Sequence, residues 1–133
     1  MYLVDTNVWL ERLLDQARSG EVGQFLGQVP SHQFSITDFA FHSIAVVLAR
    51  LGKVGVLLGF VEDIFVNGDV ALVRLQPADS GDVVGAMERF TLDFDDAYQY
   101  VAAEKHSLAI VSLDADFDRT ERGRKTPAGA LAG

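Results

Sequence analysis

The chain has 133 residues, with 19 acidic and 11 basic side chains and a net charge of −8 at pH 7. This length is typical of a single domain, which would span residues 1–133. The excess of acidic residues excludes the broad basic surface of proteins that bind nucleic acids or anionic lipids in general. The lack of cysteine excludes a disulfide framework, a thiolate zinc site and a cysteine nucleophile.

Segments with the pattern of strands alternate with segments that have the pattern of helices. Short apolar runs predict strands, and apolar residues three or four positions apart predict helices that open at Asp, Thr or Pro and end near Gly. In chain order we predict a strand at 2–4, a helix at 8–18 that ends at Gly20, a helix at 21–28 and a strand at 33–36. A helix capped by Thr37 or Asp38 then runs to 51, and a further helix spans 53–66. A strand at 70–75, a helix at 78–90, a helix from Asp93 or Asp95 to 105, and a strand at 108–113 follow. Residues 126–133, rich in Gly and Ala, are expected to form a loosely held tail.

This alternation predicts the fold class. The strands are apolar along most of their length, as expected when helices cover both faces of a sheet. Right-handed crossovers then give an α/β fold with a central parallel sheet. No apolar run reaches the roughly 20 residues of a membrane span, and the first residues lack the pattern of a secretion signal. We therefore expect a soluble cytoplasmic protein.

Acidic residues recur where predicted strands end and where a predicted helix begins: Asp5, Asp38, Asp95, Asp96, Asp114 and Asp116. An isolated Asp after a strand is most often a helix N-cap. In an open parallel sheet, however, the carboxyl ends of strands and the amino ends of helices share one edge, which is where such folds bind ligands. The joint arrangement therefore predicts that acids from distant parts of the chain converge.

Converging carboxylates favour a divalent metal. They repel one another, and a hard cation such as Mg²⁺ or Mn²⁺ removes that penalty while keeping positions open for water or substrate. Such a metal activates water and stabilises developing phosphate charge. The pattern therefore favours metal-assisted hydrolysis of a phosphodiester.

Three segments resemble PIN-domain ribonucleases. Residues 2–7 (YLVDTN) resemble their opening strand and metal-binding Asp, residues 92–97 (LDFDDA) their central Asp-Ala step, and residues 108–117 (LAIVSLDADF) their closing strand and Asp-x-Asp-Phe segment. The length and soluble character are similar to VapC-type toxins of toxin–antitoxin pairs. The resemblance implies a three-layer α/β/α sandwich with four to five parallel strands.

The resemblance also implies roles for individual residues. Asp5, Asp96 and Asp114 would bind Mg²⁺ or Mn²⁺, and Asp116 would help to bind or orient the metal; these four are the expected catalytic residues. Asp96 is preferred to Asp95 because Ala follows it. Two further side chains, Asn7 and Ser112, would hydrogen-bond around the ligands, with Ser112 standing where the family more often has Thr.

One position departs from the family pattern. The helix after the second strand normally carries a Glu, and here the matching residue is Ser43, or His42 if the register slips by one. A serine hydroxyl is a weaker ligand than a carboxylate. The resemblance implies an endoribonuclease that acts as a toxin neutralised by an antitoxin; the alternative is a catalytically weakened module retained for binding RNA or protein.

Two surface features remain open. Basic residues cluster just after Asp114, and Arg122 and Arg124 among them either form a solvated loop or contact the RNA phosphate backbone. The helices at 38–51 and 53–66 are apolar on most of their circumference. They form either a buried hairpin or an interface, with a second copy in a homodimer or with the antitoxin.

Overall fold

A computed structural model describes residues 1–132 of the chain. Its centre is a four-stranded parallel sheet in the order β3-β2-β1-β4. The strands are β1 (Tyr2–Val4), β2 (Phe34–Thr37), β3 (Ala71–Val73) and β4 (Ala109–Val111). The predicted parallel sheet is confirmed, although each strand is only three or four residues long.

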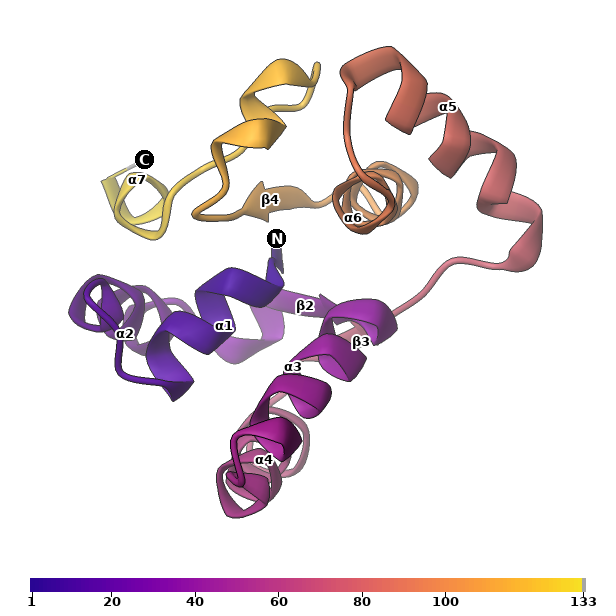
Figure 1. The fold of residues 1–133 in the computed structure, drawn as a ribbon. Coiled ribbons are helices and arrows are strands. Elements are labelled where there is room, and N and C mark those ends of the chain that lie inside the picture. Colours follow the sequence, from indigo (N-terminus) through magenta and orange to yellow (C-terminus); the bar gives the residue numbers. More distant parts are fainter. Residues whose placement is uncertain (133) are drawn as a thin grey trace.

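Helices cover both faces of this sheet. They are α1 (Thr6–Leu13), α2 (Ser19–Gln28), α3 (Asp38–Arg50), α4 (Val54–Val61), α5 (Ser80–Phe90), α6 (Phe94–Lys105) and α7 (Pro127–Ala132). Short helical turns complete the chain: η1 (Ser31–Gln33), η2 (Glu62–Val66), η3 (Pro77–Asp79) and η4 (Ala115–Arg119). In Figure 1, α5 and α6 lie apart from α1, α2 and α7, while α3 and α4 extend away from the sheet as a hairpin.

Alternation along the strands produces two cores, one on each side of the sheet. In β1, Leu3 packs with α5 and α6, whereas Val4 packs with α1, α2 and α3. In β4, Ile110 and Val111 divide in the same way. Because successive side chains of a strand point to opposite faces, β1 and β4 each contribute to both cores. The result is the three-layer α/β/α arrangement that the resemblance implied.

The first predicted helix is shorter than expected. It ends at Leu13, and Asp15 follows in a left-handed conformation with φ of 50°. The next helix begins at Ser19, so Gly20 lies inside a helix instead of ending one. Arg12 holds the corner, because its Nη1 donates to the carbonyl oxygen of Ser19 at 3.2 Å and to its hydroxyl at 3.1 Å.

The tail that the composition predicted to be loose is held in place through residue 132. The backbone N–H of Lys125 donates to the carbonyl oxygen of Ile110 at 2.8 Å, which aligns the preceding segment with β4. Pro127–Ala132 then form α7, which packs against α2 with Ala130 buried. Small residues allow this close approach, so the Gly/Ala-rich composition marked a packed helix. Gly133 lies outside the described residues.

Among residues 1–132, no helix is both long enough and apolar enough to cross a membrane.

Candidate metal centre

Acidic side chains from three separate parts of the chain share one pocket at the carboxyl edge of the sheet. This acid pocket has a volume of about 220 Å³ and contains Asp5, Asp95, Asp96 and Asp114, together with Thr6, Asn7, Leu10, Phe39, Ser43 and Gln99. Asp5 follows β1, Asp96 lies in the first turn of α6, and Asp114 follows β4. The topology therefore brings together acids that the sequence separates.

Asp5 is buried, with 6% of its surface exposed. Its Oδ1 accepts hydrogen bonds from Gln99 Nε2 and from the backbone N–H of Thr6, both at 2.9 Å, and its Oδ2 accepts from the Ser112 hydroxyl at 2.8 Å. Burial raises the pKa of the Asp5 carboxyl above its ordinary value, and these hydrogen bonds offset part of the rise. The carboxyl group is thus held in one orientation at the end of β1.

Ser112 and Asn7 connect Asp5 to the end of β4. The Ser112 hydroxyl accepts from Asn7 Nδ2 at 3.3 Å and from the backbone N–H of Asp114 at 2.9 Å. Asn7 Oδ1 in turn accepts from the backbone N–H of Leu113 at 3.1 Å. The only hydroxyl proton of Ser112 is therefore free to point at Asp5.

Asp96, Asp114 and Asp116 form the tightest acidic cluster. Each offers one carboxylate oxygen, and these three atoms lie within 4.8 Å of one another. Asp114 Oδ1 also accepts from the backbone N–H of Asp116 at 2.8 Å, which begins the turn η4. Asp116 forms an ion pair with Arg119 at 3.1 Å. Asp5 lies beside this cluster and shares the acid pocket with Asp96 and Asp114.

The pKa of Asp96 is raised to about 8. Partial burial is the largest cause, and the negative charges of Asp114, Asp93 and Asp5 add to it. Removing this repulsion requires either a proton or a cation. Carboxylate oxygens are the ligands that Mg²⁺ and Mn²⁺ prefer, so the donor set fits such an ion.

Ser43 is the residue that the resemblance places where the family has a Glu. Its side chain lines the acid pocket, whereas His42 is exposed and lines a different pocket with Asp38 and Tyr98. The alternative register that would put His42 at the acids is therefore not the one adopted. Asp95 is exposed at the rim of the acid pocket and is not part of the tight cluster.

Gln99 is a site residue that sequence reasoning missed. It is buried, and its Nε2 donates to Asp5 while its Oε1 accepts from the Thr37 hydroxyl at 2.6 Å. Thr37 Oγ1 also accepts from the backbone N–H of Ala40, so its proton is directed at Gln99. Gln99 lies one helical turn after Asp95 and Asp96, so it is on the same face of α6. This spacing is the sequence signal that could have identified it as a site residue.

Arg122 and Arg124 lie outside the acid pocket. Arg122 Nη2 donates to the carbonyl oxygen of Leu108 at 2.8 Å, near the amino end of β4. Arg124 Nη1 donates to the carbonyl oxygen of Ser112 at 3.1 Å, and its Nε pairs with Asp118 at 3.2 Å. With neighbouring residues the two arginines line a separate pocket of about 520 Å³. Their donors hold the protein's own chain, so contact with RNA stays a prediction.

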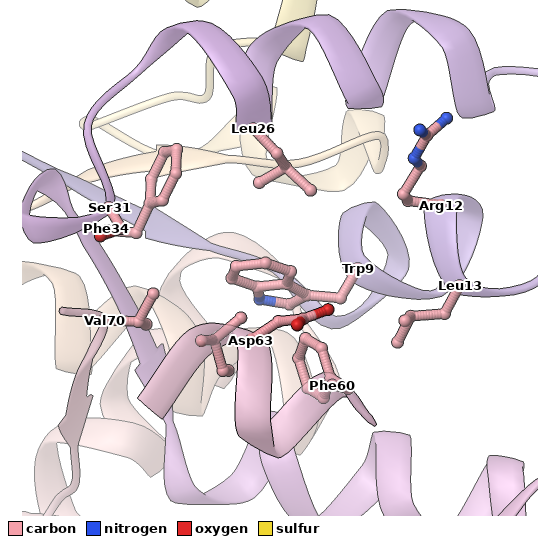
Figure 2. A pocket seen from close by; sticks show the side chains of 10 residues that line it. Trp9, Arg12, Leu13, Leu26, Ser31, Phe34, Phe60, Asp63 and Val70 are labelled. Atoms are coloured by element: carbon pink, nitrogen blue, oxygen red, sulfur yellow. The ribbon is translucent and has the colours of Figure 1, made fainter. Parts of the chain in front are cut away.

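A second pocket of similar size has a different chemistry. This apolar pocket, of about 260 Å³, lies between α1, α2 and the α4–η2 segment and is shown in Figure 2. Arg12, Ser31 and Asp63 contribute polar groups to its wall. The rest of the wall is apolar and consists of Trp9, Leu13, Leu26, Phe34, Phe60, Ile64 and Val70. It shares no residue with the acid pocket.

Comparison with known proteins gives a consistent result. A family model described as PIN domain matches residues 2–123. No curated protein is similar enough in sequence to count as a relative.

Several solved structures share the fold. A toxin–antitoxin complex from Klebsiella pneumoniae has a TM-score of 0.76 at 18% identity, covering 96% of this chain and 98% of that one. VapC20 from Mycobacterium tuberculosis, described as a toxin that cleaves the sarcin–ricin loop, has a TM-score of 0.75 at 16% identity, covering 89% and 93%. FitAcB from Neisseria gonorrhoeae has a TM-score of 0.75 at 20% identity, covering 96% and 98%.

Proposed function

The chain belongs to the PIN domain family, and we propose that it is a metal-dependent endoribonuclease, the toxin of a toxin–antitoxin pair. Family membership and structural neighbours that include VapC and FitAB toxins support a ribonuclease toxin. The observation that carries the proposal is the convergence of Asp96, Asp114 and Asp116 beside the buried Asp5. We place this activity in the cytoplasm, where RNA substrates are abundant.

Asp5, Asp96 and Asp114, which share the acid pocket, would hold Mg²⁺ or Mn²⁺, and Asp116 would help to bind or orient the ion. When bound, the ion supplies positive charge that stabilises the phosphodiester as negative charge develops on it. Asp5 keeps one orientation because Gln99, Ser112 and Thr6 hydrogen-bond both of its oxygens. This arrangement lowers the reorganisation needed during reaction, since the acidic groups are already positioned.

Ser43 bears on how strongly the site holds its ion. A hydroxyl at this place removes one negative charge from the acid pocket relative to the family pattern, so we expect weaker metal binding than a site with the Glu. A matched variant is Ser43→Glu, which restores the carboxylate. Tighter Mn²⁺ binding by this variant in calorimetry supports the assignment, and unchanged binding contradicts it.

A protein partner is part of the proposal. The hairpin of α3 and α4 projects from the sheet (Figure 1), and near its tip Leu51, Val54 and Leu58 are each more than half exposed. Exposed apolar surface of this kind favours association. We propose that it contacts a second copy in a homodimer or the antitoxin. A monomer in sedimentation that fails to bind a co-expressed antitoxin would remove this part of the proposal.

The decisive experiment is cleavage of labelled total RNA by the purified chain, with Mn²⁺ or with a chelator, beside Asp5→Asn. We expect cuts that require Mn²⁺ and that disappear in the variant. Asp82→Asn, which removes the same charge from the exposed face of α5, is the matched control and should cleave like the wild type.

Two outcomes would contradict the proposal. Cleavage that persists in Asp5→Asn removes the assigned metal site. The absence of both cleavage and Mn²⁺ binding in the wild type favours the binding-module alternative, because Ser43 then marks a site that has lost its ion.

A further inference from the structure

We propose that Phe39, Phe94 and Tyr98 form an aromatic platform on which an unpaired base of the RNA substrate stacks. The inference rests on the proposed function in one respect, namely that the ligand of the neighbouring acids is RNA. The acid pocket with its metal ion would bind the phosphate of the RNA, and the platform would bind a base.

The three rings gather at the amino ends of two helices. Phe39 lies in the first turn of α3, and Phe94 and Tyr98 lie one turn apart on α6. The ring centroid of Phe39 is 5.3 Å from that of Tyr98 and 6.5 Å from that of Phe94, and the last two are 6.2 Å apart. The rings of Phe39 and Tyr98 are inclined by only 32°, so they present nearly aligned faces.

Hydrogen bonds fix the platform in place. The Tyr98 hydroxyl donates to Asp38 Oδ1 at 2.7 Å and accepts from the backbone N–H of Leu75 at 3.1 Å. Asp38 Oδ1 also accepts from the backbone N–H of Phe39 at 2.8 Å, so the hydrogen bond from Tyr98 ties α6 to the start of α3. A ring that is already ordered loses little conformational entropy when a base stacks on it.

Phe94 is the open member of the platform. Its side chain is 45% exposed, although contact with water is unfavourable for an apolar ring. Its aromatic neighbours are Phe39 and Tyr98, and its exposed fraction leaves part of the ring for a partner. An exposed large apolar side chain beside a polar site is a common feature of binding surfaces.

The platform is continuous with the acid pocket. Phe39 lines that pocket together with Asp5, Asp96 and Asp114. Phe94 precedes Asp96 by two residues in the first turn of α6, so the two side chains leave the helix on different sides. Phe39 connects them, because it lines the acid pocket and its ring centroid is 6.5 Å from that of Phe94. A nucleotide whose phosphate lies at the acids therefore has its base within reach of the rings.

The chemistry of the chain favours a base as the occupant. With a net charge of −8, the chain as a whole repels the RNA backbone. Affinity must then come from the metal and from contacts that do not depend on charge. Single-stranded RNA is bound in this way, by stacking unpaired bases on aromatic side chains, and every base offers a flat face.

The test uses a short single-stranded oligoribonucleotide that carries the fluorescent base 2-aminopurine, titrated with the purified chain in chelator so that no cleavage occurs. Stacking quenches this fluorescence. We expect quenching by the wild type, and a roughly tenfold weaker affinity with loss of quenching in Phe94→Ala. Phe94→Trp, which keeps a flat ring, should retain both. Val84→Ala, on α5 with 47% exposure, is the matched control and should behave like the wild type.

A kinetic arm in Mn²⁺ separates a binding role from a structural one. Because stacking contributes equally before and during the reaction, Phe94→Ala should raise KM about tenfold and leave kcat within about twofold. Replacing the stacked nucleotide by an abasic one should raise KM for the wild type and leave KM of Phe94→Ala unchanged.

The outcomes distinguish this inference from the proposed function. If Phe94→Ala binds and cleaves RNA like the wild type, the platform is wrong and the nuclease stands. If the wild type binds and quenches but never cleaves with Mn²⁺, the nuclease is wrong and the platform stands. If RNA binding is unchanged while Phe94→Ala weakens self-association in sedimentation, the rings contact protein and the inference is overturned.

Discussion

The acid pocket and the apolar pocket are similar in volume, at about 220 and 260 Å³, yet their walls have opposite chemistry. In the acid pocket, partial burial together with the repulsion of neighbouring carboxylates raises the pKa of Asp96 to about 8. The apolar pocket is bounded by packed rings, such as those of Trp9 and Phe60, whose centroids are 5.3 Å apart. The acid pocket therefore lowers the stability of the metal-free fold, whereas the packed rings of the apolar pocket raise it.

This difference makes opposite demands on substitution. In the apolar region, removing a side chain should lower the free energy of unfolding and spare metal binding. In the acid region, neutralising Asp96 should raise or preserve the stability of the metal-free protein and remove metal binding.

The largest effect is expected at the apolar pocket. Phe60→Ala removes a ring that is 4% exposed and packs against Trp9, so the free energy of unfolding should fall by about 3 kcal/mol. Mn²⁺ affinity should stay within twofold of the wild type, since the two pockets share no residue. Urea denaturation and calorimetry provide the two measurements. Leu58→Ala, an exposed site on the same helix, is the control and should change stability little. A loss of Mn²⁺ affinity in Phe60→Ala would show that the two regions are coupled.

The next effect is expected from the metal. Mn²⁺ at about 100 times its dissociation constant should stabilise the wild type by about 2.7 kcal/mol, because the ion binds only the folded arrangement of carboxylates. Asp114→Asn should show little of this gain, whereas Asp82→Asn should keep it. Thermal unfolding with and without Mn²⁺ measures both. An equal gain in Asp114→Asn would mean that the ion binds elsewhere.

The smallest effect is the pH dependence of the metal-free protein. In the folded chain Asp96 keeps its proton up to about pH 8, whereas in the unfolded chain it releases the proton near its ordinary value of 3.8. The folded state therefore binds more protons between these values, and stability should fall as pH rises from about 4 to about 8. Asp96→Asn should flatten this slope and gain less than about 1 kcal/mol at pH 8, since Asp96 is only half-buried and water screens its charge. Denaturation across this pH range decides the point, and an unchanged slope in the variant would show that other groups cause it.

The sequence alone was sufficient for the alternation of elements and for the acids at their junctions. Asp5, Asp114 and Asp116 follow strands, and Asp96 opens a helix, as predicted. These features depend on local chemistry. Apolar runs mark strands, and Asp or Thr caps helices, as where Thr37 accepts from the backbone N–H of Ala40 at 2.9 Å.

The boundaries of the helices and the structure of the C-terminal residues could not be predicted without the tertiary structure. Gly20 was expected to stop a helix, but the bend came earlier, at Asp15, and Arg12 holds it through side-chain contacts with Ser19. The Gly/Ala-rich end was expected to be loose, but it packs as α7 against α2. Both depend on neighbours that are distant in sequence, which a pattern of apolar residues does not contain.

The sequence by itself determined that several carboxylates would meet at one edge of a parallel sheet, because strand ends and helix starts share that edge. Only the tertiary structure decided which atoms meet there. It selected Ser43 over His42, brought the buried Gln99 to Asp5, and turned Arg122 toward the carbonyl oxygen of Leu108 and away from the acids. The physical reason is that a hydrogen bond depends on the position of two groups to within a few tenths of an ångström. That precision comes from packing between elements, which the order of residues along the chain does not by itself specify.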